Sequence, residues 1–532
     1  MKKQFLLISM MVASVLTTFA DKTIYVAPSA SGAGTGADAG NPTTFFQALG
    51  ALDATGGFTT LVLPSGTLFQ LAGGTTGYGR IPIPDNSKII IEGNNSILEG
   101  TGSDTRIIRA STGCNVTLKN LTLRKGNAAT SLGGAIFFAG DSLKIYGCVF
   151  EKDTADNGAA IGSRGKYIKI TNCWFKGNRL RNSFQGGAIS HTGTTLGGTL
   201  IVENTTFSDN GARSGNYGFG LAIITAFDGN TRNYLSKISI TNCTFYQNNS
   251  GLNNHVGDAA IQLDSPGTTA PAGIATTATF VNNTFYGNKN CAINVKGTKQ
   301  AVRLINNVIV GDIYANTSAS GIQDNGFIME YSVAENRPAV VAENIYIVAK
   351  VSVNTKVDDP ALQSGNSDHN TLVTISSQND IDVLGLSTAL LTNGSVVPYL
   401  DIASSSSPLV EGGISSYSDI SIPTTDLSGI TRGIAATGTR YDIGAYEYNG
   451  FPITSVKDVS NDSFTISQSA SEILITSKNK PISVNAYLPN GQSVYTNPKS
   501  NSTTISKTQL PKGVLIFIIN DGEKSVAKKL IN

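Results

Sequence analysis

The middle of the chain repeats one pattern of apolar and polar positions. An alternating apolar strand is followed by Asn, two residues, a large apolar anchor, two more residues, and Asn or Asp. Clear copies are anchored at Phe175, Phe207, Phe245 and Phe285, and weaker ones at Leu123, Phe150, Ile309 and Ile347. Self-similarity at a period of roughly 20–50 residues is typical of solenoids. The pattern therefore predicts one stacked repeat domain.

The period of two within each strand predicts which side chains face the interior. The residue two positions before each anchor shares the face of the anchor. We therefore expect this column to be buried, although Asn283 breaks its small and mostly apolar character. Its members are Leu121, Cys148, Cys173, Thr205, Cys243 and Asn283.

The same period places Trp174 next to inward positions, so its side chain is expected to point outward. It is then either a platform for a sugar ring or a residue covered by a neighbouring loop. Cys148 and Cys173 are expected on adjacent coils. They either form a disulfide or stack as buried thiols.

Two turn signatures separate the predicted strands. The Asn before each anchor suits a turn because Asn tolerates left-handed backbone, and stacked Asn side chains are expected to hydrogen-bond as a ladder. Three short strands and three turns need roughly 20–25 residues, and Phe285 and Ile309 are 309 − 285 = 24 residues apart. This predicts an all-β, right-handed parallel β-helix in which longer repeats carry insertions. The second signature follows most anchors as Gly133-Gly-Ala-Ile136, Gly158-Ala-Ala-Ile161, Gly186-Gly-Ala-Ile189 and Gly220-Leu-Ala-Ile223.

The pairing of Phe-x-x-Asn with Gly-Gly-Ala-Ile resembles the repeats of polymorphic outer-membrane proteins and their pectin-lyase-like β-helix relatives. Thr23 to Pro28 resembles the entry to exported β-helices, where Asn41 would cap a short covering helix opened by Pro42. The segments 407–410, 426–429 and 442–448 resemble the closing part of such proteins. The resemblance assigns residues 21–450 to the β-helix and its N-terminal capping segment, and implies a fold rather than an activity.

Both ends of the chain carry predicted targeting signals. Residues 1–20 have basic Lys2 and Lys3, an apolar run and small residues before Ala20, which predicts a cleaved secretory signal. No later stretch is long enough to predict a transmembrane span. The mature chain is therefore expected to be exported.

After a linker at 451–456, residues 457–532 predict a small C-terminal β-sandwich with strands at 473–476, 482–488 and 514–519. This part resembles the C-terminal sorting domain of the type IX secretion system. The resemblance implies the type IX secretion machinery as a partner. It also implies a secreted or outer-membrane-surface location in a Gram-negative, Bacteroidota-type bacterium. The alternative is an ordinary appended β-domain.

Composition and charge narrow the function classes. Charged residues are 14% and Gly is 57 of 532, which favours strands and tight turns. The net charge of +2 combines +4 from residue 457 onward, +2 from the signal and 28 − 32 = −4 from residues 21–456. A mildly acidic β-helix excludes a general nucleic-acid binder. With 3 His and 5 Cys, no metal site is predicted.

The longest insertions flank the repeats anchored at Phe175, Phe207 and Phe245, and insertions on a solenoid gather on one face. Arg, Tyr, Asp and His side chains in such a groove suit sugar binding by stacking and bidentate hydrogen bonds. The alternative is that they are solvated loop residues. Before the Ala-Ile signature these candidates are Arg179, Arg181, Arg213, Tyr217, His255 and Asp258; after it they are His191, Asp228, Arg232, Tyr234 and Asp264.

Two function hypotheses follow. The first is a non-catalytic surface or secreted β-helix that binds a polysaccharide or a host or cell-surface glycan, or acts in adhesion, through the long-loop face. The second is a polysaccharide lyase or glycoside hydrolase in the same groove, which needs a base and a cation or Ca²⁺, or two close carboxylates. No cofactor is expected under the first hypothesis. No catalytic motif set of either enzyme class is recognisable.

Overall fold

A computed structural model describes most of the chain from residue 21 onward. In the repeat region and the segment after it, the described residues are 21–52, 57–72, 80–128, 131–182, 185–214, 220–225, 234–251, 259–264, 276–289, 291–296, 300–311, 325–330, 339–349, 351–355, 369–392, 397–433 and 440–448. In the C-terminal part they are 464–468, 471–477, 481–487, 493–511, 514–520 and 525–531. Structural statements below concern these residues, so the proposed signal at 1–20 and the linker at 451–456 lie outside them.

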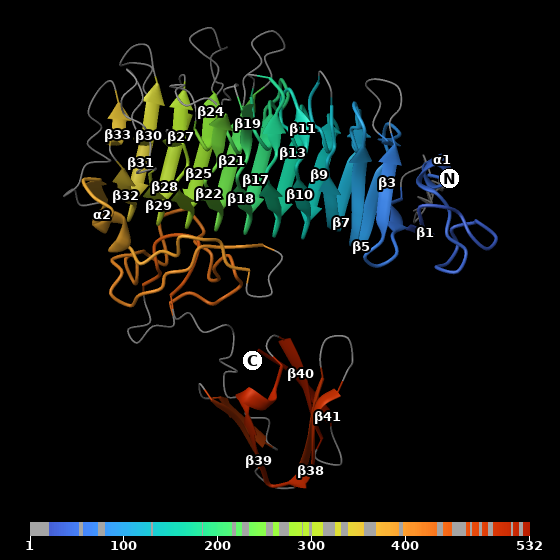
Figure 1. The fold of residues 1–532 in the computed structure, drawn as a ribbon, viewed down its shortest axis with the longest axis vertical. Helices are drawn as coiled ribbons and strands as arrows, with labels where there is room; N and C mark the ends of the chain where they lie inside the picture. Colours follow the sequence, from blue (N-terminus) through green and yellow to red (C-terminus); the bar gives the residue numbers. More distant parts are fainter. Residues whose placement is uncertain are drawn as a thin grey trace, which may run out of the picture.

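The repeats form a parallel β-helix whose coils stack along one axis (Figure 1). The largest sheet, sheet A, has 20 strands. They are β1 Lys22–Tyr25, β2 Thr59–Val62, β3 Leu68–Ala72, β5 Lys88–Thr101, β7 Asn115–Arg124, β9 Ser142–Tyr146, β10 Val149–Glu151, β13 Tyr167–Thr171, β14 Trp174–Lys176, β17 Gly198–Glu203, β18 Thr206–Ser208, β21 Leu235–Thr241, β22 Thr244–Tyr246, β25 Thr276–Val281, β26 Thr284–Tyr286, β28 Gln300–Ile305, β29 Val308–Val310, β31 Ala339–Glu343, β32 Tyr346–Ala349 and β34 Thr371–Thr374.

Two further parallel sheets complete the coils. Sheet B has ten strands: β4 Ile81–Ile83, β6 Ile108–Ala110, β8 Ile136–Phe138, β12 Ile161–Ser163, β16 Ile189–His191, β20 Ile223–Thr225, β24 Ile261–Asp264, β27 Cys291–Lys296, β30 Asn325–Glu330 and β33 Val351–Thr355. Sheet C has four short strands, β11 Thr154–Ala155, β15 Arg179–Leu180, β19 Gly211–Ser214 and β23 Asn249–Gly251. The predicted all-β parallel architecture is confirmed.

The predicted left-handed Asn turn is confirmed in every repeat. It bends sheet A between the strand pairs β13 and β14, β17 and β18, and their equivalents. A φ near +50° costs most residues energy and Asn little. The residues at this turn are Asn120, Asn172, Asn204, Asn242, Asn282, Asn306 and Asn344, with φ between 48° and 55°, and Gly147 with φ 62°.

The Asn ladder exists, but mainly through the other Asn of each repeat. Asn178, Asn210, Asn248 and Asn288 are buried, and the amide nitrogen of each of the first three donates to the side-chain oxygen of the next, at 2.9, 3.0 and 2.9 Å. At the turn, Asn242 Nδ2 donates to Asn204 Oδ1 at 3.1 Å, whereas the amides of Asn120, Asn306 and Asn344 bond other groups. The difference arises because the second Asn points inward, where its amide has only neighbouring coils as partners.

The predicted inward column is confirmed, and the place of Asn283 in it is explained. All of its members are at most 2% exposed. The Asn283 amide donates to Asn307 Oδ1 and Ile240 O, and its Oδ1 accepts from Cys243 N, all within 3.0 Å. A second, shorter amide ladder therefore satisfies the polar group inside the core.

Aromatic anchors stack beside this column. The rings of Phe150, Phe175, Phe207, Phe245 and Phe285 follow one another at centroid distances of 4.5, 4.8, 5.0 and 4.7 Å. All five cysteines are buried free thiols, and Cys148 N lies 3.4 Å from Cys173 Sγ. Of the two sequence alternatives, the structure contains stacked thiols.

Steric crowding explains why glycine occupies the first position of the Gly-x-Ala-Ile signature. Gly133, Gly158, Gly186 and Gly220 have φ between 57° and 74°. A Cβ at Gly186 would lie 2.4 Å from Ile189 O. The first Gly therefore turns the chain into each strand of sheet B, where only Gly combines this φ with this close approach.

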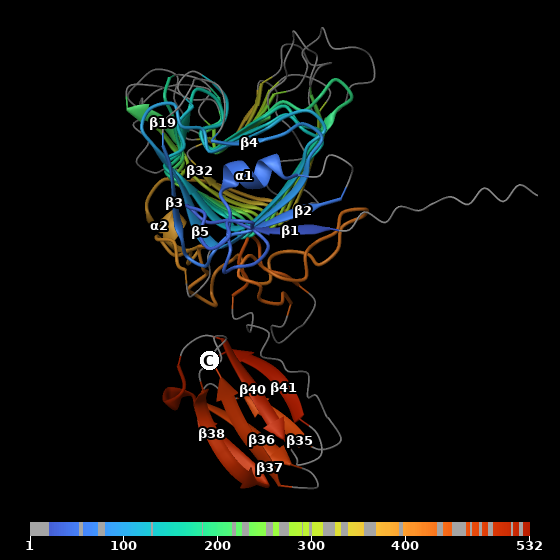
Figure 2. The same cartoon turned by 90° about the vertical axis from the view of Figure 1, so that its right-hand side faces the viewer.

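A short helix covers the first coil, as predicted, but its cap is not Asn41. Helix α1, Phe45–Gly50, is capped by Thr44, which forms a capping box with Gln47. Thr43 is held extended by a bridge to Val26, so the helix cannot begin at Pro42. Figure 2 shows α1 lying across the end of the coil, where Phe45, Ala48 and Leu49 join the core.

Residues 376–448, here the closing segment, pack on the outer face of sheet A beneath β29 and β32 in Figure 1. The segment contains helix α2, Asn379–Asp382. It is tied to the coils by bonds from Asn242 Nδ2 to Thr425 O at 2.7 Å, Ala445 N to Thr284 Oγ1 at 2.9 Å and Gly444 N to Asn306 O at 2.8 Å. Distant parts of the sequence thus share one hydrogen-bonded interface.

The C-terminal residues form a separate antiparallel two-sheet structure. One sheet pairs β35 Phe464–Gln468, β36 Glu472–Ser477 and β39 Ser502–Ser506; the other pairs β37 Ile482–Tyr487, β38 Ser493–Ser500, β40 Val514–Asn520 and β41 Ser525–Ile531. A 3-10 turn, η3, covers Lys507–Gln509. The two sheets enclose their own core, which includes Ile475, Val484 and Phe517. This is the arrangement expected of a small sandwich.

Asp153 begins the inward amide ladder and supports a pH prediction. Its backbone N donates to Asn178 Oδ1 at 2.9 Å, and its carboxylate accepts from Gly126 N at 2.7 Å. Complete burial raises the pKa of Asp153 well above its usual value. The folded state then binds a proton that the unfolded state has lost, so this contribution to stability is present at low pH and is lost as pH rises through the raised pKa.

We expect Asp153→Asn to remove this fall and to increase the free energy of unfolding at pH 8 by about 1–3 kcal/mol. Urea unfolding at pH 5 and pH 8, followed by the fluorescence of Trp174, measures it. Asp85→Asn, at an exposed carboxylate, should leave the pH dependence unchanged. A variant with the same slope as the parent protein would contradict the assignment.

Candidate functional site

The connections next to sheet B are where the repeats differ in length. Three residues, 164–166, join β12 to β13, whereas residues 226–234 follow β20 and residues 265–275 follow β24. From β9 onward the turn between the two halves of sheet A is always two residues long, and in β5 and β7 the strand is continuous. Variable connections on a regular scaffold are where binding residues gather. The outer face of sheet B is therefore the candidate site.

The outward side chains of β24 and β27 are polar. Ile261 and Leu263 belong to the interior core, so the alternate residues Gln262 and Asp264 face outward, and Asn294 and Lys296 are their register partners. Gln262 Nε2 donates to Asp264 Oδ1 at 2.8 Å. We call Gln262, Asp264, Asn294 and Lys296 the polar strip.

The polar strip is half buried and half accessible. Gln262 and Asn294 are 2% and 1% exposed, and Gln262 Oε1 has no hydrogen-bond partner among the described residues. Lys296 is exposed. Amide, carboxylate and ammonium groups at neighbouring register positions are the groups that hydrogen-bond sugar hydroxyls. Of this strip, the sequence singled out only Asp264. The sequence feature that drew attention to Asp264 was its position after the Ile of an Ala-Ile signature.

His191 is not a residue of this face. It follows inward Ile189 by two positions on β16, so its ring points into the core and is completely buried. Its Nδ1 lies 3.4 Å from Ser163 O, and burial lowers the pKa of His191 to about 4. A neutral buried imidazole cannot contact a ligand in the groove, so its assignment to the site was wrong.

Arg179 on β15 and Arg181 just after it have partners on other coils. Arg179 hydrogen-bonds the backbone oxygen and the carboxylate of Asp209 on the next coil. Arg181 Nη1 donates to Asn127 Oδ1 at 3.3 Å. These contacts link one coil to another, so both arginines have a structural role. Arg213 on β19, in contrast, has an exposed side chain.

Tyr234 lies on the other flank of sheet B. It forms an antiparallel bridge with Thr194, and a Cβ at Gly197 would lie 3.2 Å from its ring. Leu196, between them in sequence, is 89% exposed. Tyr234 therefore supports a turn that presents an apolar tip beside β16.

The remaining predicted residues are not placed. Tyr217, Asp228, Arg232, His255 and Asp258 lie outside the described residues. Of the eleven candidates, the structure therefore places Asp264 on sheet B, Tyr234 beside it and Arg213 on sheet C, each without a role that excludes binding.

Three carboxylates form a buried cluster in the closing segment. Glu447 Oε2 lies 3.1 Å from Arg432 Nη1, and Arg432 also donates to Asn242 Oδ1 at 3.2 Å and Gly444 O at 2.9 Å. Asp426 accepts from Glu447 N at 3.0 Å, and Asp442 accepts from Glu411 N at 2.7 Å. Burial raises the pKa of Asp442 to about 7 and also raises that of Asp426 and Glu447. We call Asp426, Arg432, Asp442 and Glu447 the carboxylate cluster. Its bonds are all internal, which indicates a structural role.

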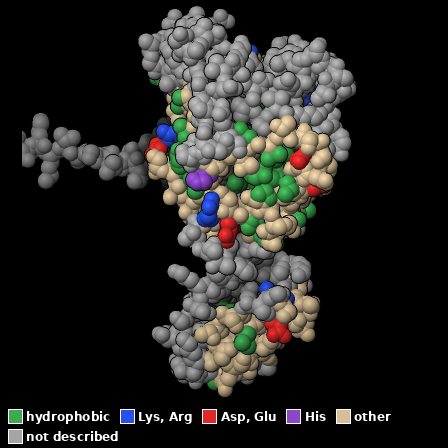
Figure 3. Space-filling model, turned by 90° about the vertical axis from the view of Figure 1, so that its left-hand side faces the viewer, with side chains coloured by type: hydrophobic (Ala, Val, Ile, Leu, Met, Phe, Trp, Pro, Cys, Tyr) green, Lys and Arg blue, Asp and Glu red, His purple; other side chains and the backbone are tan. Residues whose placement is uncertain are grey.

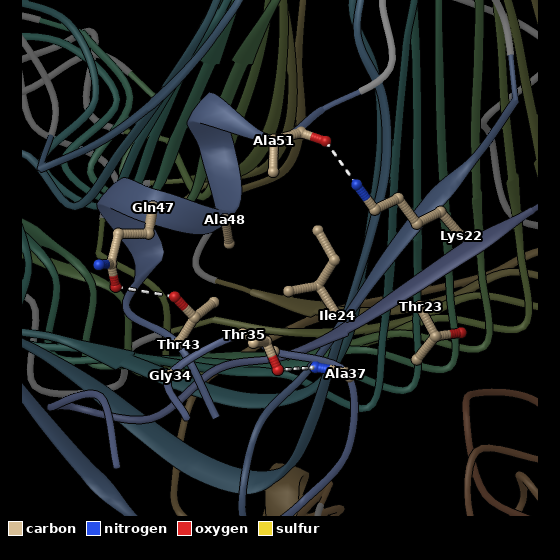
Figure 4. A pocket seen from close by; sticks show the side chains of 11 residues that line it. Lys22, Thr23, Ile24, Gly34, Thr35, Ala37, Thr43, Gln47, Ala48 and Ala51 are labelled. Carbon is tan, nitrogen blue, oxygen red and sulfur yellow. Dashed lines mark hydrogen bonds between the residues drawn. The ribbon is translucent and has the colours of Figure 1, made fainter. Parts of the chain in front are cut away.

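One pocket lies at the N-terminal end. Its volume is roughly 360 Å³, and it lies between β1 and α1 (Figure 4). Lys22 Nζ donates to Ala51 O at 2.8 Å, and Thr43 donates to Gln47 Oε1 at 2.7 Å. None of the predicted site residues lines this pocket.

The opposite end of the β-helix has a different surface. Figure 3 looks onto the end where β33 lies and shows hydrophobic side chains gathered on part of it. Within residues 339–448 the most exposed large hydrophobic side chains are Val341 and Val383, at 41% and 56%. Among the described residues no group of three His, Cys, Asp or Glu lies together as a metal site, and no helix has the length and apolarity to cross a membrane.

Comparison with known proteins agrees with this geometry. A family model described as "Right handed beta helix region" matches residues 108–337. No curated protein matches the chain. The matched residues run from β6 through β30 and so include the coils that carry the polar strip. The match and the stacked parallel sheets together identify the repeat region of this chain as a right-handed parallel β-helix.

Proposed function

We propose that this protein is an exported, non-catalytic β-helix that binds a glycan on the outer face of sheet B. The observation that supports the proposal most is the pair Asp264 and Lys296 of the polar strip, which are register partners on two adjacent strands and are not buried. Long connections, residues 252–260 and 265–275, flank β24. A rigid parallel sheet holds the groups at fixed spacing, which lowers the entropy cost of binding a repeating polymer.

The charge of this face favours a neutral or mixed ligand. Asp264 and Lys296 are register partners, so an acidic and a basic group lie side by side. Neighbouring opposite charges suit hydroxyl-rich ligands better than a polyanion. Arg213, exposed on β19, supplies a further planar donor group for a sugar hydroxyl or carboxylate.

In this proposal, the two ends of the chain determine where the protein is located. Residues 1–20 direct export, and the C-terminal sandwich is the sorting domain that the type IX secretion machinery recognises. Its basic sequence and small antiparallel core are compatible with that role. The protein would then act at the outer surface of a Gram-negative cell or in the medium.

A glycan array with the purified full-length protein tests the binding function. We expect binding to a restricted set of glycans, reduced about tenfold or more by Asp264→Ala and by Arg213→Ala. Asp382→Ala, at an exposed carboxylate on α2, is the matched control and should bind normally. The absence of any bound glycan, or equal binding by all three variants, would overturn the proposal.

The same glycans separate binding from catalysis. Incubation of each bound glycan with the protein should release neither unsaturated nor new reducing ends. If such products appear and Asp264→Ala abolishes them, the chain is a lyase or hydrolase that uses Asp264 as an acid or base. That outcome would replace the non-catalytic function by the enzymatic one.

A further inference from the structure

The cavity between β1 and α1 contains a lysine at a position that the repeat otherwise fills with buried side chains. Lys22 lies on the same face of β1 as the buried Ile24, two positions away. On the following coils its register position is occupied by Thr59 and then by Ile89, Val116 and Leu143. All four of these side chains are buried. The first coil therefore places an ammonium group where the later coils place part of their core.

Lys22 uses one of its donors within the chain. Its Nζ donates to Ala51 O at 2.8 Å, on the opposite side of the cavity (Figure 4). A cation beside the last carbonyls of a helix is favourable, which explains this bond. The carboxylate of Asp21, next in sequence, accepts from Phe58 N at 3.2 Å, and Lys22 forms no ion pair with a described residue. Its remaining donors are available to an anion that enters the cavity.

Next to Lys22, β1 has a free backbone edge. Lys22 N donates to Phe58 O on the side of β2, whereas Tyr25 N donates to Gly36 O on the opposite edge. Because bonding direction alternates along a strand, Thr23 faces the same edge as Tyr25. Thr23 lines the cavity, and no described residue bonds its backbone at this edge. Its N–H and C=O can therefore pair with an added strand.

The wall of the cavity is apolar and closely shaped. Ile24 and Ala48 are buried and line it from β1 and from α1 (Figure 4). A Cβ at Gly36 would lie 2.6 Å from Ile24 Cγ2 and 3.0 Å from Thr43 Cγ2, so glycine is needed in this wall. The volume of roughly 360 Å³ is near the lower end for small-ligand sites, about 300–1,000 Å³. This suits one small aliphatic side chain and the backbone beside it.

We propose that this cavity binds the carboxyl end of an extended peptide with small apolar side chains. The peptide backbone would pair with Thr23 as an added strand, and its terminal carboxylate would accept from Lys22 Nζ. One aliphatic side chain would fill the space between Ile24 and Ala48. A simple aliphatic acid would use the ammonium and the apolar wall but would leave the backbone edge unpaired. The inference goes beyond the proposed function, because it concerns the N-terminal end of the β-helix and a peptide instead of a glycan.

Saturation-transfer NMR with the purified protein and the peptide acetyl-Ala-Ala-Val tests this inference. The free acid is compared with the C-terminal amide of the same peptide and with hexanoate. We expect the free acid to bind about tenfold more tightly than the amide, because only the acid pairs with the ammonium group. Hexanoate should bind more weakly than the free acid, because it has no amide groups for the edge of β1.

Three variants separate the contributions to binding. Lys22→Gln keeps a donor for Ala51 O but removes the charge, so it should weaken binding of the free acid about tenfold and leave that of the amide unchanged. Thr23→Pro removes an N–H that the ladder with β2 does not use, so it should weaken binding of the peptide acid but not of hexanoate. Ala51→Phe, at an exposed residue that lines the cavity, should block all three probes.

Lys144→Gln is the matched control, because Lys144 is an exposed lysine on β9 that does not line the cavity. It should bind like the parent protein. Lys22 and Ala51 are exposed, so their variants should unfold at the temperature of the parent. Lys22→Gln therefore keeps the inference testable even if Thr23→Pro destabilises the first coil.

Three results would overturn the inference. They are equal binding of the acid and the amide by the parent protein, equal affinities of Lys22→Gln and Lys144→Gln for the acid, and hexanoate binding as tight as that of the peptide. The last result would assign the cavity to simple aliphatic acids. Failure of the glycan array with retained peptide binding would overturn only the proposed function, because none of these variants lies on sheet B.

Discussion

Replacing Arg432 with Met is expected to lower the free energy of unfolding by about 3–5 kcal/mol at pH 8. Arg432 is 3% exposed and is the only cation of the carboxylate cluster. Its removal leaves Asp426, Asp442 and Glu447 buried without a compensating charge. It also breaks the bond to Asn242 Oδ1, which joins the closing segment to the coils.

The effect should depend on pH in a defined direction. The folded-state pKa of all three carboxyls is raised, that of Asp442 to about 7, so the folded state binds more protons than the unfolded state above about pH 4. Stability from this cluster is therefore present at low pH and falls as pH rises toward 7. Arg432 lowers these pKa values, so its loss steepens the fall.

Calorimetric unfolding at pH 5 and pH 8 measures both quantities. The loss caused by Arg432→Met should be smaller at pH 5, where the carboxyls take up protons. Arg303→Met is the matched control, because Arg303 also bridges a coil to the closing segment, through Asp419 at 2.8 Å, but at an exposed site. Its loss should cost at most about 1 kcal/mol. An equal cost for both arginines would contradict the role of the cluster.

The second large effect is expected from Asn210→Ala. Asn210 is completely buried, and its Oδ1 accepts from the backbone N and the amide of Asn178 at 3.1 and 2.9 Å. Its amide donates to Phe175 O at 2.9 Å and Asn248 Oδ1 at 3.0 Å. Alanine leaves these partners buried and unsatisfied, so we expect a loss of about 3–5 kcal/mol.

The single tryptophan makes this loss measurable at the coil concerned. Trp174 lies on the same coil as Asn178, so urea unfolding followed by its fluorescence reports the neighbourhood of the ladder. Asn182→Ala is the control, because Asn182 is exposed and its amide donates to Asp156 Oδ1 at 2.8 Å. Its effect should stay within about 0.5 kcal/mol. Similar losses in both variants would show that the ladder adds no stability.

Several features of the fold followed directly from the sequence. The period of two located the inward column from Leu121 to Asn283, because alternation in a strand needs no knowledge of distant residues. The left-handed turn at Asn172 and its equivalents was predictable for the same reason, since backbone preference is a local property. The covering helix was predicted, but its cap was misplaced by three residues, because a tertiary bridge holds Thr43 extended.

The candidate site was predicted less well. The sequence located the face by the insertions beside sheet B but could not separate inward from outward side chains after each Ala-Ile signature. His191 was therefore included although it faces the core, and Gln262, Asn294 and Lys296 were missed.

The sequence by itself determined the repeat, the inward and outward faces of each strand and the residues that turn the chain, because these depend on neighbours a few positions away. Only the tertiary structure decided which Asn forms the long ladder and where the closing segment lies. Arg432 and Asn242 meet across 190 residues, and Thr206 donates to Pro398 O across 192 residues. Such contacts depend on how coils stack and where a distant segment packs, which no local pattern encodes.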